Sequence, residues 1–162
     1  MNEIENPKNI FEIGLGTNNS DVVSTMGSNG RPGASLKAFK EYLPHANIYG
    51  GDYDKRILFN EKRIKTFFID QTNPTTFDDL DKVLSKDFDL MIDDGLHAPN
   101  ANLNSLKFFL NHIRVGGFAV IEDVNQDSEA LWKIVSFLIE PCFESALIKT
   151  KTSSMFIVER VG

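Results

Sequence analysis

The stretch FDLMIDDGLH, from Phe88 to His97, decides how the rest of the chain is arranged. Five mostly apolar residues end at two adjacent carboxylates, Asp93 and Asp94, and a glycine follows them. A short apolar run cut off in this way is typical of a buried parallel strand that has reached its carboxyl end. Because ligands of open α/β sheets bind beyond these strand ends, we expect a functional site here.

A second stretch has the same form. The sequence GGFAVIEDV, from Gly116 to Val124, reads as another buried strand that ends in Glu122 and Asp123. Two neighbouring strands would then bring four carboxylates and the imidazole of His97 to one rim of the sheet. Carboxylates crowded together repel one another, so such a rim usually holds a cation, a proton or a cationic ligand.

Outward from these two strands, apolar segments alternate with segments of helical spacing. We expect further strands at Ile10–Leu15, Asn47–Tyr53, Ile64–Asp70, Phe143–Lys149 and Ser154–Val161, helices at Ser35–Leu43, Pro99–Ile113 and Ser128–Leu138, a short helix from Asp54 to Asn60, and a helix that Pro74 opens. Such alternation predicts a parallel sheet with helices on both faces. The expected fold class is therefore α/β: a Rossmann-like doubly wound, mostly parallel sheet in three layers (α/β/α) with a C-terminal antiparallel hairpin.

Composition sets the broad class. The 162 residues are enough for one domain, expected to cover residues 1–162, and the apolar fraction of 41% is ordinary for a globular protein. The net charge of −6 argues against nucleic acid as a partner. With Cys142 as the single cysteine, no internal disulfide can form. Neither a leader segment nor a run long enough to cross a membrane is apparent, so we expect a cytoplasmic protein.

The segment Glu12-Ile-Gly-Leu-Gly16 indicates a nucleoside site at the end of the first strand. Glycines at Gly14 and Gly16 would let the backbone approach a ligand, although a tight turn would also require them. Asn18 stands where the usual fingerprint has a third glycine. Asp52, at the tip of the second strand, strengthens the interpretation because a carboxylate there can accept both ribose hydroxyls.

Two further segments have both a functional and a plain structural interpretation. Asp70-Gln71 ends the third strand, and it could bind the amino edge of an adenine or form an Asx turn ahead of Pro74. The long glycine-rich loop Thr17–Gly33 has the length and position of a mobile lid. His97 could cap a helix, but the carboxylates beside it favour a catalytic role. His45 and His112 have no such neighbours, so we expect them at the surface.

The segments EIGLG, GGDYD, IDQ, IDDGLH and RVGGFAVIED follow in order over nearly the whole chain. On these motifs the sequence resembles class I S-adenosylmethionine-dependent methyltransferases. Within that class, DDG-x-H followed by GG…IED is similar to the metal-dependent sugar O-methyltransferases of the macrocin and mycinamicin type. The resemblance implies S-adenosylmethionine as cofactor and a hydroxyl of a sugar or glycosylated small molecule as acceptor. A homo-oligomer is compatible with it.

The resemblance also implies roles for residues of this chain. Mg²⁺ or Mn²⁺ would be held by Asp94, Glu122 and Asp123, with His97 as general base. The cofactor-binding candidates from the strand-end segments are Glu12, Gly14, Gly16, Asn18, Asp52, Tyr53, Asp70, Gln71 and Asp93. A cation would stabilise the alkoxide of the acceptor, an imidazole titrating near neutrality could take its proton, and the alkoxide would attack the sulfonium methyl in line.

Two other functions are compatible with the motifs. A nicotinamide-dependent oxidoreductase would use a similar glycine turn, but Gly16 and Asp52 are separated by more than the roughly 20 residues usual for that fingerprint. A non-catalytic module of the same fold could bind cofactor or a partner without turnover. The sequence identifies neither the acceptor nor the oligomeric state.

Overall fold

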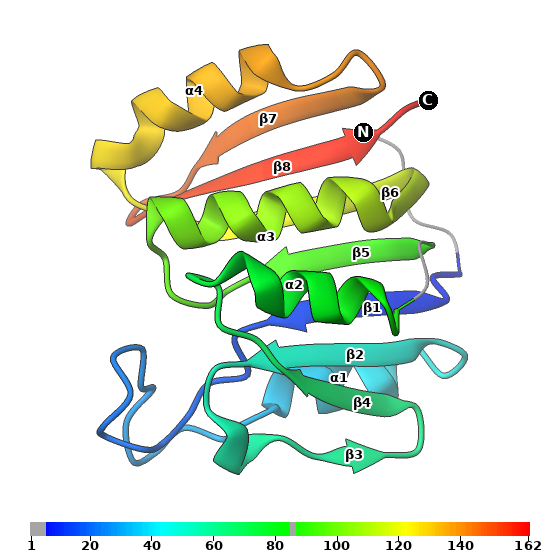
Figure 1. The fold of residues 1–162 in the computed structure, drawn as a ribbon, viewed down its shortest axis with the longest axis vertical. Helices are drawn as coiled ribbons and strands as arrows, with labels where there is room; N and C mark the ends of the chain where they lie inside the picture. The colour runs from blue at the N-terminus through cyan, green and yellow to red at the C-terminus, as the bar shows by residue number, and fades with distance from the viewer. Residues whose placement is uncertain (1–5, 85–86) are drawn as a thin grey trace.

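The computed structural model describes residues 6–84 and 87–162, and its centre is a mixed sheet in which eight strands are found (Figure 1). The strands are β1 (Asn9–Ile13), β2 (Asn47–Asp52), β3 (Asn60–Glu61), β4 (Ile64–Phe68), β5 (Phe88–Asp93), β6 (Ile113–Val124), β7 (Phe143–Lys149) and β8 (Ser154–Arg160). Their order across the sheet is β3-β4-β2-β1-β5-β6-β8-β7. The central strands β4, β2, β1, β5 and β6 are parallel to one another. Their carboxyl ends therefore share one edge of the sheet.

The antiparallel strands lie at the two sides. β8 runs antiparallel to β6, and β7 pairs with β8 as a terminal hairpin, as the sequence predicts. β3 pairs antiparallel with β4 at the opposite side. The predicted fold class is thus confirmed: the sheet is doubly wound, mostly parallel, and ends in an antiparallel strand pair.

Helices cover both faces of the sheet. They are α1 (Ala34–Tyr42), α2 (Pro74–Asp81), α3 (Pro99–His112) and α4 (Glu129–Leu138), with short 3₁₀ turns η1 (Lys55–Ile57) and η2 (Gln126–Ser128). In Figure 1, α2 and α3 lie in front of the sheet and α1 lies behind β2 and β4. Among the helices of the described residues, none is long and apolar enough to cross a membrane.

Each face of the sheet has its own core. Phe11 and Ile13 of β1 belong to the larger core, together with Phe88 and the rings of Phe108 and Phe109 on α3. Ile10, their neighbour on β1, belongs to the smaller core under α1. Successive side chains of a strand point to opposite faces, so a strand buried on both faces is apolar without interruption. This is why the central strands could be recognised in the sequence.

Several elements differ from the sequence-based expectations. The helix expected from Asp54 to Asn60 is only the single turn η1, which the Asp54 side chain caps by accepting from the N–H of Arg56 at 3.1 Å. The chain then turns into β3, a two-residue edge strand that no periodicity could reveal. β6 begins at Ile113 rather than Gly116, because the strand continues through its glycine pair.

His112, expected at the surface, is a core residue. It is 1% exposed and its ring stacks on Phe108, with the ring centroids 3.9 Å apart. Its Nδ1 lies 2.8 Å from the carbonyl oxygen of Phe108, and its Nε2 lies 3.2 Å from a carboxylate oxygen of Asp81. The prediction was wrong because the partners come from the previous helix turn and from α2, not from neighbours in sequence.

Candidate active site

The turns after β1 and β5 are joined at the carboxyl edge of the sheet. Gly14 has a φ of +95° and donates its N–H to the carbonyl of Gly51 at the end of β2 (2.9 Å). Asp94 donates its N–H to the carbonyl of Ile13 (2.9 Å). The glycine turn and the Asp-Asp-Gly turn therefore form one continuous ledge.

A cavity of about 350 Å³ opens above this ledge, at the tips of β1, β2 and β4, where the sequence places the cofactor. Predicted cofactor residues that line it are Gly14, Gly16, Asp52, Tyr53, Asp70 and Gln71. Asp94, expected to be a metal ligand, lines it as well, and so does the loop segment Asp21–Ser24. Residues predicted to bind cofactor and a residue predicted to bind metal thus border a common space.

Asp52 shapes the cavity as well as lining it. Its Oδ2 accepts from the N–H of Leu15 and its Oδ1 from the N–H of Asp54, both at 2.8 Å. Burial raises the pKa of Asp52 above its ordinary value, and these backbone hydrogen bonds oppose that rise. Because each carboxylate oxygen can accept more than one hydrogen bond, Asp52 can hold the glycine turn and still receive a ligand hydroxyl.

Asp70 forms the Asx turn that was one of its two expected roles, and it also lines the cavity. Its Oδ1 accepts from the N–H of Thr72 at 2.9 Å. Tyr53 lines the same cavity, is 60% exposed, and packs its ring against Phe68 at a centroid distance of 6.1 Å. The rim of the cavity at β2 and β4 is therefore partly aromatic, which suits a planar base.

Gln71 and Asp93 form a buried network behind the cavity. Nε2 of Gln71 donates to Oδ1 of Asp93 (2.7 Å) and to the hydroxyl of Ser105 (2.8 Å), while its Oε1 accepts from the N–H of Leu96 (2.9 Å). Asp93 is 0% exposed, and its Oδ2 accepts from the side chain of Asn102 (2.9 Å). The carboxylate of Asp93 therefore positions the Asp-Asp-Gly turn rather than facing a ligand, in contrast to its predicted cofactor contact.

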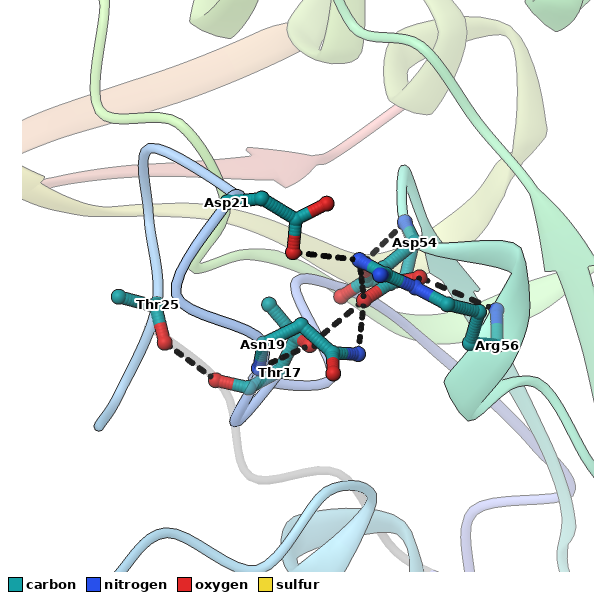
Figure 2. A network of polar contacts seen from close by, with 7 residues as sticks. Thr17, Asn19, Asp21, Thr25, Asp54 and Arg56 are labelled. Atoms are coloured by element: carbon teal, nitrogen blue, oxygen red, sulfur yellow. Dashed lines mark hydrogen bonds and ion pairs between the residues drawn. The ribbon is translucent and has the colours of Figure 1, made fainter. Parts of the chain in front are cut away.

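The loop between Thr17 and Gly33 is tied to the end of β2 by a network of polar contacts around Asp54 (Figure 2). Asp54 is buried and accepts from the hydroxyl of Thr17 and the amide of Asn19, each at 2.7 Å. Arg56 donates its Nε to Oδ1 of Asp54 (2.7 Å) and reaches Asp21 through NH2 (3.0 Å). The guanidinium holds the pKa of Asp54 well below its ordinary value. This one buried carboxylate fixes the loop segment that lines the cavity.

Asn18 belongs to the loop and not to the cavity wall. Its amide donates to the carbonyls of Gly27 (2.9 Å) and Gly30 (2.8 Å), which closes the loop on itself. The residue was predicted to bind cofactor because it replaces the third glycine of the fingerprint. In the structure that position starts a folded loop instead of a helix, so its side chain is used locally.

A group of side chains that could hold a metal ion lies beside the cavity. Asp94, His97 and Asp123 each place one ligand atom within 4.8 Å of the others, and Nε2 of His97 lies 3.8 Å from Oδ1 of Asp94. His97 and Asp123 have φ values of +54° and +48°. Left-handed backbone in a non-glycine residue is costly and is concentrated at functional sites.

The charges of this group fit a divalent cation. Burial raises the pKa of Asp94 and of Glu122, and repulsion from neighbouring carboxylates adds to both shifts. Two carboxylates and an imidazole are acceptable ligands for Mn²⁺, and Mg²⁺ takes the oxygens. The predicted ligands Asp94 and Asp123 are thus brought together. Glu122 lies outside the compact group, although it is near enough for the charges of both aspartates to affect it.

Glu12 is the predicted cofactor residue whose environment is the least expected. It is 5% exposed, its Oε1 accepts from the hydroxyl of Ser35 (2.8 Å), and its Oε2 has no hydrogen-bond partner in the part of the chain that is described. Burial raises its pKa to about 7, and the charges of Asp94 and Glu122 contribute to the rise. Glu12 is not among the cavity-lining residues, but it lies near enough to Asp94 and Glu122 for their charges to affect it.

Sequence reasoning missed the contributions of Asp54 and Arg56, and of the loop segment Asp21–Ser24. A carboxylate followed two residues later by arginine is a common surface pattern, so it carried no signal on its own. Only its burial against Thr17 makes it part of the site.

Comparisons with known proteins give relatives of known activity. No protein-family model matches the chain. Mycinamicin VI 2''-O-methyltransferase of Micromonospora griseorubida is 37% identical over 94 residues, which are 57% of this chain and 23% of that protein. Demethylmacrocin O-methyltransferase of Streptomyces fradiae is 35% identical over 92 residues, with the same shares. A tetracenomycin-C 3'-O-methyltransferase of Streptomyces olivaceus, acting on a 2-methoxy-rhamnosyl compound, is 31% identical over 121 residues, 73% of this chain and 28% of that protein.

Solved structures show the same fold. The MycE methyltransferase of the mycinamycin pathway, in complex with Mg, SAH and mycinamycin VI, superposes with a TM-score of 0.70 at 23% identity, covering 95% of this chain and 44% of that chain. The SAH-bound methyltransferase PaMTH1 of Podospora anserina gives a TM-score of 0.64 at 15% identity, covering 96% and 73%. The chain therefore has the class I methyltransferase fold. It spans about a quarter of the length of the curated relatives that it matches.

Proposed function

We propose that this chain transfers the methyl group of S-adenosylmethionine to a hydroxyl of a sugar or glycosylated small molecule, with the help of a divalent cation. The observation that carries the proposal is the junction of the strand-end cavity with the group Asp94, His97 and Asp123. The names of the relatives support the acceptor class, since all three describe O-methylation and one names a rhamnosyl compound.

The cofactor would occupy the cavity at the tips of β1, β2 and β4. Asp52 would accept the ribose hydroxyls, with the rim of Tyr53 and Asp70 beside the adenine. The glycine turn brings backbone N–H groups close to the ligand, because Gly14 and Gly16 have no side chains to keep it away. Asp94 lines the same cavity, so we place the reacting methyl group toward Asp94, His97 and Asp123.

His97 is the base in this proposal. Its ring is partly exposed beside Asp94, and its Nδ1 has no hydrogen-bond partner among the described residues, so neither nitrogen is committed to a strong contact. The imidazole would take the proton of the acceptor hydroxyl while the hydroxyl oxygen attacks the methyl carbon and the carbon–sulfur bond of the sulfonium breaks.

The carboxylates supply the cation site. Asp94 and Asp123 would hold Mg²⁺ or Mn²⁺, and Glu122, which feels the charges of both, would join them. A bound cation would supply the positive charge that makes a nearby hydroxyl more acidic. Without one, burial and mutual repulsion raise the pKa of Asp94 and of Glu122, and a bound cation would offset that repulsion.

Calorimetry tests the proposal directly. The protein would be titrated with S-adenosylmethionine and, separately, with NAD, in the presence of Mg²⁺ and then of excess chelator. We expect S-adenosylmethionine to bind in both conditions, because the cavity and the group Asp94, His97 and Asp123 are adjacent but distinct. We expect NAD to bind in neither condition. Methyl transfer to a panel of glycosylated macrolides and rhamnosides should then occur only with the cation. Binding of NAD alone would contradict the proposed cofactor, and transfer in excess chelator would contradict the role of the cation.

A further inference from the structure

Asp123 lies close to Asp94 and His97, and β6 bulges at this point, at its carboxyl end. Ile121 pairs with Phe156 of β8 and Val124 pairs with Ser154, so two residues of β6 face a single residue of β8. The extra residue of a bulge is left unpaired and re-aims the local side chains. Asp123 has a φ of +48°, and its carboxylate meets the tip of the hairpin that β7 and β8 form.

The hairpin tip meets Asp123 with one hydroxyl. Oγ of Ser153 donates to Oδ1 of Asp123 at 2.8 Å, and this is the only side-chain hydrogen bond to that carboxylate within residues 6–84 and 87–162. The other oxygen, Oδ2, is left available to a ligand. Ser153 therefore decides which way an otherwise exposed carboxylate is oriented.

The backbone that carries the Ser153 hydroxyl is itself held in place. Within the tip, Thr150 donates its N–H to the carbonyl of Ser153 (2.9 Å), and its hydroxyl accepts from the N–H of Ser153 (3.0 Å). At the base of the tip, Lys149 pairs with Glu129 of α4 at 2.7 Å, and the hydroxyl of Ser154 donates to the same carboxylate at 3.2 Å. The hydrogen bonds within the tip and the contacts with Glu129 of α4 thus fix the position from which Ser153 donates.

We propose that Ser153 is a positioning residue for the cation site, which holds the carboxylate of Asp123 in the orientation that binds a divalent cation. The inference rests on the proposed function, because it requires Asp123 to be a ligand. A carboxylate ligand that is held by a hydrogen bond loses less conformational freedom on binding, and removal of such an outer partner typically weakens metal affinity about 10- to 100-fold.

The experiment is a titration of the whole chain with Mn²⁺ in the absence of cofactor and acceptor. Electron paramagnetic resonance measures the concentration of free Mn²⁺ at each step. The variants are Ser153→Ala, which removes the hydroxyl, and Ser153→Thr, which keeps it. Thr152→Ala is the matched control, because it lies in the same tip and its side chain makes no hydrogen bond to any described residue. We expect Ser153→Ala to bind Mn²⁺ about tenfold more weakly, with Ser153→Thr and Thr152→Ala near the wild type.

A double-mutant cycle with Asp123→Asn separates orientation from general damage to the turn. If Ser153 acts through Asp123, the effect of Ser153→Ala on Mn²⁺ affinity should disappear in the Asp123→Asn background. Unchanged affinity in Ser153→Ala, or an equal loss in Thr152→Ala, would overturn the positioning role and leave the proposed function intact. Absence of Mn²⁺ binding by the wild type would overturn the cation site itself and this inference with it.

Discussion

A Cβ atom on Gly14 would lie 2.1 Å from the main-chain oxygen of Asp94. No real Cβ contact is so short, and the obstacle is backbone that cannot rotate away as a side chain could. The glycine turn after β1 and the Asp-Asp-Gly turn after β5 can therefore approach only if this position has no side chain. The close packing of these two turns brings the strand-end cavity next to the group formed by Asp94, His97 and Asp123.

Gly14→Ala should accordingly damage both stability and cofactor binding. The backbone would have to shift to relieve the contact, and alanine at a φ of +95° adds a conformational cost of about 1–3 kcal/mol. Gly27→Ala is the control, because Gly27 has a φ of +74° but no atom within 4 Å of an added Cβ. Thermal unfolding and calorimetry with S-adenosylmethionine would measure both effects. Equal losses of stability and affinity in the two variants would show that the positive φ, and not the contact with Asp94, causes the damage.

Asp52→Ala should weaken S-adenosylmethionine binding by about 1–3 kcal/mol, because ligand hydroxyls would lose their acceptor. The structure adds a second effect, since the N–H groups of Leu15 and Asp54 would also lose theirs. Asp52→Asn keeps one acceptor oxygen and should retain more stability than Asp52→Ala. Calorimetry and chemical denaturation of both variants would check this. Full affinity in Asp52→Ala would mean that the ribose binds elsewhere.

The loop Thr17–Gly33 should become more dynamic when Arg56 is replaced. Arg56→Gln would leave the buried Asp54 without its cation and break the contact to Asp21. Amide hydrogen exchange of the loop should therefore be faster, and S-adenosylmethionine should slow it by ordering the segment over the cavity. Lys62→Gln removes the same charge at an exposed site away from the loop. Identical exchange in the wild type and Arg56→Gln would show that Arg56 does not hold the loop in place.

The stability of the cofactor-free protein should depend on Glu12 between pH 4.5 and about 7. Its folded-state pKa lies above the ordinary value, so the folded state binds the proton more tightly. This contribution to stability is complete below pH 4.5 and is lost as the pH rises through about 7. The shift corresponds to roughly 3 kcal/mol. Relative to wild type, Glu12→Gln should gain stability across that range in denaturant titrations, and a constant difference would contradict the assignment.

His97 and Asp94 should be separable by what each variant still binds. Asp94→Asn should lose Mn²⁺ and turnover but keep S-adenosylmethionine, because Asp52 and the glycine turn remain. His97→Ala should keep both ligands and slow methyl transfer by roughly 10²–10⁴-fold, the usual contribution of a general base. The Mn²⁺ titration decides between the two roles of His97, since His97 also belongs to the group with Asp94 and Asp123 that could hold a metal ion. Loss of Mn²⁺ in His97→Ala would make it a ligand instead of a base.

The sequence predicted the sheet and the place of the site because both depend on local pattern. Strands buried on both faces are apolar without interruption, and a carboxylate or glycine marks the point where each one ends. The strand boundaries are accordingly within a few residues of those expected, and the cavity lies where Gly14, Gly16 and Asp52 indicated.

The contributions that could not be predicted depend on contacts between distant segments. Asp93 and Asp94 are adjacent and chemically identical, yet one is buried by Gln71 and Asn102 while the other borders the cavity. The bulge that turns Asp123 toward Ser153 arises from the pairing of β6 with β8. No periodicity in either strand encodes that register.

The sheet order places β8, the last strand in the sequence, between β6 and β7. Every segment of the cofactor cavity precedes β6 in the chain, whereas Ser153 directly precedes β8. In a chain growing from its N-terminus, the segments of the cavity therefore emerge well before Ser153, which orients the carboxylate of Asp123. A nascent chain stalled before Ser154 would leave β6 as an unpaired sheet edge, so we expect ribosome pausing in this region to promote aggregation.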